Sequence, residues 1–188
     1  MIRRANDDEL EEIKLWSDHF FGDPYLSMEE YRKYSAGPDG FLYIFEENGE
    51  ILSASMAFSE NREVLMEDMD VTAEEWDRFC KDKKGVRLKF AWTKEKARGR
   101  RLALSVIEAI LSDVEKQGTF GAVFTQLWDP KADLVPFEEN ARELGFRFLR
   151  HQRSPWYKQK YAHCRCSVCG GMCRCDADVY VKEFKQNG

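Results

Sequence analysis

Hydrophobic side chains recur along the centre of the chain with two different periods, which predict two kinds of element. Residues 86–93 alternate between apolar and polar side chains, which is typical of a strand with one buried face. Residues 101–117 instead have an apolar side chain every three or four positions, which predicts a helix that Gly118 can end. The buried stripe of this helix consists of Leu104, Ile107, Leu111 and Val114. Residues 122–127 are almost continuously apolar and predict a strand that is covered on both faces.

The N-terminal part of the chain predicts a short strand followed by two helices. Residues 2–5 form the strand, and Asn6 or Asp7 can cap the first helix. The apolar side chains of this helix are spaced for one face, and they are Leu10, Ile13, Leu15 and Trp16. Ser27 is followed three positions later by a glutamate, so a capping box predicts that the second helix begins there.

A hairpin and a third helix follow. Residues 41–45 and 51–58 are apolar runs, and the Asn48-Gly49 pair between them is a strong signal for a tight turn. We therefore expect two antiparallel strands. Thr72 and Glu75 form another capping box, which predicts a helix that ends at Gly85.

The last third of the chain predicts a helix and two further strands. The helix spans residues 136–144 and ends at Gly145. The strands span residues 146–149 and 178–184. Strands and helices thus alternate along most of the chain, which indicates an α/β class of fold.

The composition limits the kind of protein. The chain has 188 residues, of which 43% are hydrophobic and 13% aromatic, enough for the buried core of a single domain. It contains no apolar run of the length that crosses a membrane, and its first residues are too charged for a signal peptide. We expect a soluble cytoplasmic protein, either monomeric or homodimeric.

Charge is unevenly distributed. Asp and Glu outnumber Lys and Arg by 22 to 10 in residues 1–85, whereas Lys and Arg outnumber them by 8 to 4 in residues 86–118. A basic centre can attract a phosphorylated partner, although a solvated acidic surface explains the first part equally simply. The overall net charge of -5 argues against a nucleic-acid partner.

The basic residues gather at one turn. Residues 94–101 contain five cations, directly before the predicted helix. A cation in the first turn of a helix opposes the helix dipole, typically by ~0.3 to 1 kcal/mol. We therefore expect these side chains to hold an anion, and a phosphate fits best because the free N–H groups of a helix start point at such a ligand.

This turn resembles the acyl-CoA-binding motif of the GNAT N-acetyltransferase superfamily. The motif reads Arg or Gln, two residues, Gly, one residue, then Gly or Ala, and the chain has Arg98 and Ala103 at its ends. Arg101 departs from it, since it stands where the motif has a glycine. The element order matches over nearly the whole chain, and Gly145-Phe146 resembles the ending of the family's helix before its sixth strand.

The resemblance implies a fold and an activity. The fold is GNAT-like and of the α/β (α+β) class, with a mixed, mostly antiparallel sheet flanked by helices in a single domain over residues 1–188. The activity is transfer of an acetyl group from acetyl-CoA to a primary amine of a small molecule or peptide. The alternative is a catalytically inactive module that binds acyl-CoA or serves as a metal-stabilised interaction module.

The resemblance also implies which residues bind the coenzyme. By alignment, backbone groups of Ala91, Trp92 and Thr93 hold the pantetheine arm, and one N–H faces the thioester oxygen, where an oxyanion develops. The turn that binds the diphosphate consists of Arg98, Gly99, Arg100, Arg101, Leu102 and Ala103.

Candidates for proton transfer come from three places. Glu67, Asp68 and Asp70 lie in an acidic segment before Thr72 that is either an exposed loop or the group that receives and deprotonates the amine, for which we consider Glu67 and Asp68 first. His19 and His151 are candidates by chemistry alone.

The general acid of the family is a tyrosine four residues before the Gly of the Gly-Phe pair, and here Ala141 occupies that position. Tyr157 and Tyr180 are the alternatives, although tyrosines near strands more often belong to the core or its rim.

A cysteine-rich segment lies near the C-terminus. It contains five of the six cysteines of the chain: Cys164, Cys166, Cys169, Cys173 and Cys175. Their spacing fits a tetrahedral thiolate site for Zn²⁺, and Gly170-Gly171 permits the tight turn that such a site needs. Four sulfurs fill one ion, so either one cysteine stays free or His163 joins a two-ion set. An iron–sulfur cluster and a metal-free reduced loop are the alternatives.

We expect this segment, residues 158–177, to be an insertion between the last two strands. In the family that connection borders the acceptor site. A bound ion would order a loop that is too small to have a core. The insertion therefore either shapes acceptor specificity or only stabilises its hairpin.

Overall fold

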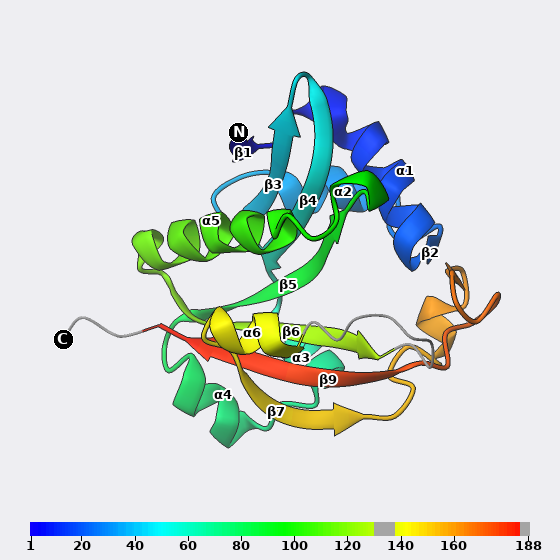
Figure 1. Ribbon diagram of the computed structural model, residues 1–188. Coiled ribbons are helices and arrows are strands. Elements are labelled where there is room, and N and C mark those ends of the chain that lie inside the picture. Colours follow the sequence, from blue (N-terminus) through cyan, green and yellow to red (C-terminus); the bar gives the residue numbers. More distant parts are fainter. Residues whose placement is uncertain (130–137, 185–188) are drawn as a thin grey trace.

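A seven-stranded sheet runs through the molecule with helices on both faces (Figure 1). The computed structural model describes residues 1–129 and 138–184. The strands lie in the order β1 (Ile2–Arg4), β3 (Gly40–Glu47), β4 (Glu50–Ser59), β5 (Lys84–Thr93), β6 (Phe120–Asp129), β9 (Asp176–Glu183) and β7 (Arg147–Gln152). Neighbouring strands are antiparallel except β5 and β6, which are parallel. This mixed, mostly antiparallel sheet confirms the predicted fold class.

The helices divide between the two faces according to the core that each one packs into. Helices α5 (Leu102–Gln117) and α6 (Glu138–Glu143) cover one face. The other face carries α1 (Leu10–Phe21), α2 (Met28–Ser35), α3 (Arg62–Met69) and α4 (Ala73–Phe79). Short 3-10 turns span Asp7–Glu9, Glu95–Ala97 and Gln159–Tyr161. Strands β2 (Gly22–Asp23) and β8 (Arg165–Cys166) form a separate two-stranded sheet.

The strongest sequence signals are confirmed. Asn48 and Gly49 have φ angles of 54° and 77°, so both adopt the left-handed conformation of a tight hairpin turn between β3 and β4. All four predicted stripe residues of α5 are buried, and Gly118 follows that helix with a φ of 68°. Ser27 and Thr72 both cap helices as expected.

The prediction that β5 buries one face throughout is wrong. Phe90 lies opposite Met56 and Leu88 lies opposite Ala57, so Lys89 is an extra residue in the ladder, a β-bulge. One additional residue reverses which side chains face each way. Val86 and Leu88 therefore pack under α5, whereas Phe90 packs on the opposite face with α1 and α2.

The acidic segment before Thr72 forms α3 rather than a loop. Asn61 caps it, because its side-chain oxygen accepts hydrogen bonds from the N–H groups of Glu63 and Val64, at 2.9 and 3.3 Å. Leu65 and Met69 are buried under this helix. The sequence did not predict this helix because charged residues interrupt its apolar stripe.

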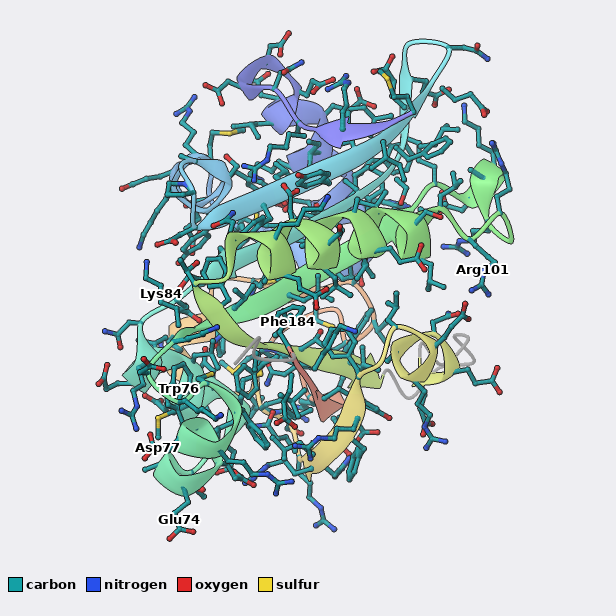
Figure 2. All side chains as sticks on the ribbon, turned by 90° about the vertical axis from the view of Figure 1, so that its left-hand side faces the viewer. Glu74, Trp76, Asp77, Lys84, Arg101 and Phe184 are labelled. Atoms are coloured by element: carbon teal, nitrogen blue, oxygen red, sulfur yellow. The ribbon has the colours of Figure 1, made fainter. Side chains whose placement is uncertain are left out.

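Two further expectations are corrected. Leu15 is 67% exposed, so the buried face of α1 consists of Leu10, Ile13 and their neighbours without it. Gly85 does not end α4, which stops at Phe79, but lies inside β5 beneath the ring of Trp76. Figure 2 shows Trp76 and Lys84 at one end of the molecule and Arg101 at the other.

The predicted helix over residues 136–144 is present as α6, and its first two residues lie outside the described part of the chain. No helix in the described residues is both long and apolar enough to cross a membrane.

We predict that Gly85→Ala destabilises the fold by about 1–3 kcal/mol, since an added Cβ would lie 2.6 Å from the Trp76 ring. That ring is buried and stacks on Phe124, so it has little room to move. Urea denaturation of the wild type and the variant measures the difference. Gly171→Ala is the control, because nothing lies within 4 Å of its Cβ position, and equal stability of the two variants would contradict the prediction.

Candidate functional site

The sheet forks between its two parallel strands. Strands β5 and β6 pair from Lys84 and Phe120 as far as Leu88 and Thr125, where the described pairing ends. Beyond that point β5 continues along β4, and β6 continues along β9 (Figure 1). The Thr125 hydroxyl donates to the Leu88 carbonyl at 3.2 Å and closes the narrow end of the fork.

Beyond Leu88, the backbone groups of β5 face β4 and the fork alternately. The Lys94 N–H donates to the Leu52 carbonyl on β4 at 2.9 Å. Backbone groups alternate along an antiparallel strand, so those of Trp92 also face β4, whereas those of Ala91 and Thr93 face the fork. Two of the three residues predicted to hold the pantetheine arm therefore have backbone groups that face the fork and find no backbone partner within residues 1–129 and 138–184.

Trp92 has a packing role instead. Its ring is buried with α1, and its Nε1–H donates to the Ser17 hydroxyl at 3.0 Å.

The predicted phosphate turn connects the end of β5 to the start of α5. The first hydrogen bond of the helix runs from the Ser105 N–H to the Arg101 carbonyl at 3.1 Å. Within the described part of the chain, no acceptor binds the N–H groups of Leu102, Ala103 and Leu104. Such a set of free donors at a helix start is suited to an anion.

Arg101, which stands where the acyl-CoA motif has a glycine, has a left-handed backbone conformation. It has a φ of 60° and Gly99 has a φ of 79°, so both residues of the turn are left-handed. This conformation costs a residue with a Cβ roughly 1–2 kcal/mol, and a glycine would adopt it freely. Arg101 therefore adopts, at a cost in stability, a conformation that a glycine at this position would adopt freely.

The cations of the turn already have carboxylate partners, which the sequence analysis did not foresee. Arg100 pairs with Glu47 at 2.7 Å, and Arg101 pairs with Glu143. The remaining pairs are Lys94 with Glu12 and Glu50, Lys96 with Glu50, and Arg98 with Glu95. Exposed ion pairs contribute only about 0–1 kcal/mol, so the arginines can exchange a carboxylate for a phosphate.

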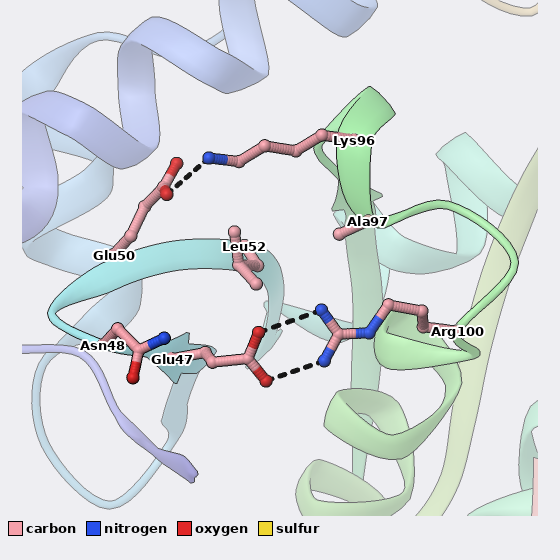
Figure 3. Close-up of a pocket in the computed structure, with 7 residues that line it drawn as sticks. All are labelled: Glu47, Asn48, Glu50, Leu52, Lys96, Ala97 and Arg100. Atoms are coloured by element: carbon pink, nitrogen blue, oxygen red, sulfur yellow. Dashed lines mark hydrogen bonds and ion pairs between the residues drawn. The ribbon is translucent and has the colours of Figure 1, made fainter.

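A recess of about 260 Å³ lies beside this turn (Figure 3). Leu52 and Ala97 form its apolar part, and two ion pairs, from Lys96 and Arg100 to the β3–β4 hairpin, border it.

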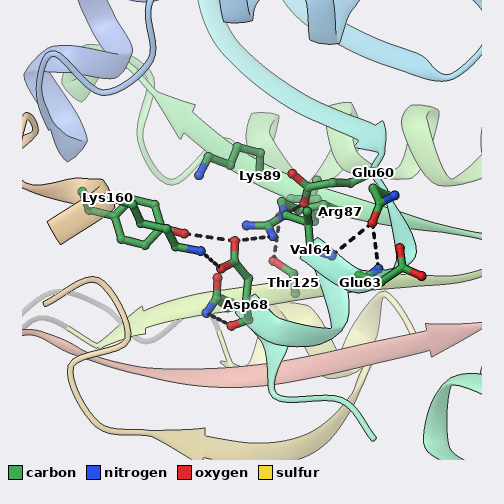
Figure 4. A network of polar contacts seen from close by, with 12 residues as sticks. Glu60, Glu63, Val64, Asp68, Arg87, Lys89, Thr125 and Lys160 are labelled. Carbon is green, nitrogen blue, oxygen red and sulfur yellow. Dashed lines mark hydrogen bonds and ion pairs between the residues drawn. The ribbon is translucent and has the colours of Figure 1, made fainter. Parts of the chain in front are cut away.

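A buried polar network lies on the opposite face of the sheet, near the narrow end of the fork (Figure 4). Arg87, only 3% exposed, forms ion pairs with Glu60 at 2.7 Å and Asp68 at 2.8 Å. Asp68 also accepts hydrogen bonds from Lys160 and from the Tyr161 hydroxyl. Burial disfavours its charge, but Lys160 and Arg87 outweigh that effect and lower the pKa of Asp68 to about 2.

Asp68 is thus a carboxylate held by three donors, which makes it a weak proton acceptor at neutral pH. Glu67 is exposed and approaches Lys160 at 3.7 Å. Asp70 ends α3 in a left-handed conformation and pairs with Arg150 at 3.4 Å.

The other predicted proton-transfer residues are dispersed. Tyr157 is 50% exposed, directly before the cysteine-rich segment and beside Arg174, and Tyr180 is buried in the core under α5. The His151 ring is exposed and bonds to Asp178, which raises its pKa. His19 is exposed and lies 3.6 Å from Glu95.

Lys89 and Tyr25 were missed by the sequence analysis. The Tyr25 hydroxyl donates to the Lys89 carbonyl at 3.2 Å, and the Lys89 ammonium lies 5.3 Å from the centre of the Tyr25 ring. The pKa of Lys89 is lowered to about 8, chiefly by burial and secondly by repulsion from Arg87. Two cations in a largely apolar strand were the available signal, but the expected alternation assigned them to a solvated face.

Four of the predicted metal ligands converge. The sulfur atoms of Cys166, Cys169, Cys173 and Cys175 all lie within 4.8 Å of one another. The fifth cysteine, Cys164, is not part of this group, and His163 is exposed. Gly170 has a φ of 68°, as a tight turn between the cysteines requires.

Backbone groups support the sulfur cluster. The Cys169 N–H donates to the Cys166 sulfur at 3.5 Å, and the Arg174 N–H donates to the Cys169 sulfur at 3.4 Å. The latter hydrogen bond is the main cause that lowers the pKa of Cys169.

The chain matches no protein-family profile and no curated protein, but it does match solved structures. NAA60 of Arabidopsis thaliana, solved with a bisubstrate analogue, has 14% identity and a TM-score of 0.72, with 98% of each chain covered. The ribosomal-protein-S18-alanine N-acetyltransferase of Escherichia coli has 13% identity and a TM-score of 0.66, covering 100% of this chain and 96% of its own.

A third structure is YncA of Salmonella typhimurium, a putative acetyltransferase with its cofactor acetyl-CoA. It has 10% identity and a TM-score of 0.67, covering 100% of this chain and 95% of its own. The chain therefore has the GNAT N-acetyltransferase fold. At these identities the likeness establishes the fold alone.

We predict that Arg101→Gly raises the free energy of unfolding by about 0.5–1 kcal/mol, because relief of the left-handed strain exceeds the added entropy of the unfolded chain. Arg100→Gly is the matched control, since Arg100 has a negative φ and gains only entropy in the unfolded state. Chemical denaturation compares the two variants, and equal destabilisation of both would refute the strain argument.

Proposed function

We propose that the protein is an acetyl-CoA-dependent N-acetyltransferase that acts on a primary amine, and that its cysteine cluster holds a structural zinc ion. The observation that carries the first part is the fork between β5 and β6, which opens beside a helix start whose first N–H groups have no acceptor in the described residues. The GNAT fold of the chain supports it.

Binding of the coenzyme would use backbone groups above all. The N–H groups of Leu102, Ala103 and Leu104 would donate to its diphosphate, while Arg98 and Arg100 exchange their carboxylate partners for phosphate oxygens. The pantetheine arm would lie in the fork and meet the free backbone groups of Ala91 and Thr93. Its thioester would then reach the narrow end.

The reaction would be a direct transfer. The neutral amine attacks the thioester carbonyl carbon, a C–N bond forms and the C–S bond breaks, so coenzyme A leaves as a thiolate that takes up a proton. A fork-facing N–H stabilises the oxyanion of the tetrahedral intermediate. The amine must lose its proton, and Glu67 is our candidate acceptor, since the Asp68 carboxylate is already held by three donors.

The group that protonates the thiolate is open between two tyrosines. Tyr157 is exposed directly before the cysteine-rich segment, whereas Tyr161 joins the buried network through Asp68. Burial raises the pKa of Tyr161 to about 12, so its hydroxyl keeps its proton at neutral pH.

An inactive coenzyme-binding module is the second candidate function. It is favoured by Ala141, a buried residue at the position where the family has its tyrosine acid. Coenzyme binding without release of free thiol across a panel of amines would support this alternative.

The zinc proposal rests on the sulfur geometry. In a tetrahedral zinc–thiolate site, bonds of about 2.3 Å place the sulfurs about 3.8 Å apart. The four sulfurs lie within 4.8 Å of one another, so small side-chain movements would complete the site. Zinc would hold together a loop that has almost no core of its own.

We predict that Arg98→Glu combined with Arg100→Glu weakens acetyl-CoA binding at least about tenfold, because two phosphate contacts are replaced by repulsion. Titration calorimetry measures the affinity. Arg32→Glu with Lys116→Glu changes the charge equally at exposed positions outside the turn and should leave the affinity unchanged. Equal affinity in the wild type and the turn variant would show that phosphates do not bind here.

We predict close to one zinc ion per chain after purification without chelators, as measured by elemental analysis. Cys169→Ser should lose the metal, whereas Cys164→Ser should keep it, because Cys164 lies outside the sulfur group. Iron with visible charge-transfer absorption, or no metal in the reduced wild type, would contradict the assignment.

A further inference from the structure

The cysteine cluster is linked to a distant part of the chain through backbone hydrogen bonds. Its ligand Cys166 lies in β8, which pairs with β2, so that Cys166 lies opposite Gly22 and Arg165 opposite Asp23. The Ser167 hydroxyl also donates to the Phe20 carbonyl at 2.8 Å. We call this pair of segments, residues 20–25 and 165–167, the strap.

The two segments of the strap are connected to opposite arms of the fork, which are β4 with β5 and β6 with β9. Residues 165–167 lie on the chain that connects β7 to β9, and β9 pairs with β6. Residues 20–25 are attached to β5 instead, because the Tyr25 hydroxyl donates to the Lys89 carbonyl. Figure 1 shows β2 beside the insertion, next to the open ends of β5 and β6.

An aromatic side chain of the strap lies between the two arms. The ring of Phe21 is 6.1 Å from the ring of Phe90 on β5 and 6.4 Å from that of Trp128 on β6. It also contacts Tyr25, with ring centres 4.9 Å apart. The strap thus covers the fork with an aromatic layer on the face opposite α5.

The position of the strap matters for the acceptor. The coenzyme would enter from the turn at the start of α5, so the amine must approach the thioester from the opposite face. That face is the one that the strap spans. The two hydrogen-bonded segments of the strap thus lie across the face on which a polypeptide acceptor would have to bind.

We propose that the metal-loaded cysteine cluster locks the strap across the fork, so that the acceptor is a small primary amine rather than a polypeptide. This inference rests on the proposed acetyl transfer and on the zinc site. Loss of the metal would free β8 from β2, so residues 20–25 would keep only their contacts with β5 and would no longer bridge the acceptor side.

Hydrogen exchange tests the lock without any measurement of activity. In Cys169→Ser, we expect the amides of residues 20–28 to exchange at least about tenfold faster than in the zinc-loaded wild type. Helix α4, residues 73–79, is the internal reference for intact folding, and Cys164→Ser is the matched control in the same loop. Faster exchange confined to residues 166–175 would overturn the proposal.

Gly22→Ala opens the strap from the other side while all four cysteines remain. Its Cβ would lie 2.4 Å from the Arg165 carbonyl oxygen, and Gly22 has a φ of 131°. We expect faster exchange in residues 165–167 with zinc retained. Unchanged exchange there would show that β2 and β8 do not hold each other.

Release of free thiol tests the acceptor class. We compare a short alkylamine with a hexapeptide that has a free N-terminus, in the wild type, Cys169→Ser and Gly22→Ala. The wild type should prefer the alkylamine at least about tenfold, and both variants should reduce that ratio. A wild-type ratio near one would overturn the size restriction while leaving acetyl transfer intact. No thiol release with any amine would refute the proposed function, and the exchange data would still decide whether the metal locks the strap.

Discussion

The divergence of β5 and β6 is the feature on which the rest of the structure depends. It begins where Leu88 and Thr125 form their last pair, one residue before the bulge at Lys89. The bulge turns the side chains of β5 to the opposite faces, and beyond the divergence one edge of β5 has no strand partner among the described residues. Backbone groups at such an edge need other hydrogen-bond partners, and a bound ligand is one source of them.

Polar contacts near the divergence connect β5 to the segments on the β6 and β9 side of the fork. Arg87 lies just before the bulge, and its ion pair with Asp68 connects β5 to α3. Asp68 in turn binds Lys160 and Tyr161, which lie on the segment between β7 and β9. A buried carboxylate with several donors is strongly position-specific, because removing any partner leaves a charge unpaired. The strap adds a second connection at the open end.

Electrostatics act differently on the two faces of the fork. At the turn before α5, exposed arginines pair with carboxylates of neighbouring segments, so a phosphate that bound there would replace one weak ion pair with another. On the opposite face, Lys89 lies among buried groups and has no carboxylate at ion-pair distance in the described residues. Carboxylates therefore balance the cations at the turn before α5, whereas the cation on the opposite face, Lys89, has no such partner among the described residues.

Local signals in the sequence determined most of the helices and strands, the position of the turn before α5, and the group of cysteines. Capping boxes, the Asn48-Gly49 turn, the stripe of α5 and the cysteine spacing all depend on residues close together in the chain, so their geometry follows from local sterics and hydrogen bonding. The tertiary structure alone decided the bulge at Lys89, the partners of the turn arginines, the network around Asp68 and the pairing of β2 with β8. These depend on contacts between segments far apart in sequence, and a one-residue bulge leaves the hydrophobic pattern unchanged while it reverses the faces of a strand.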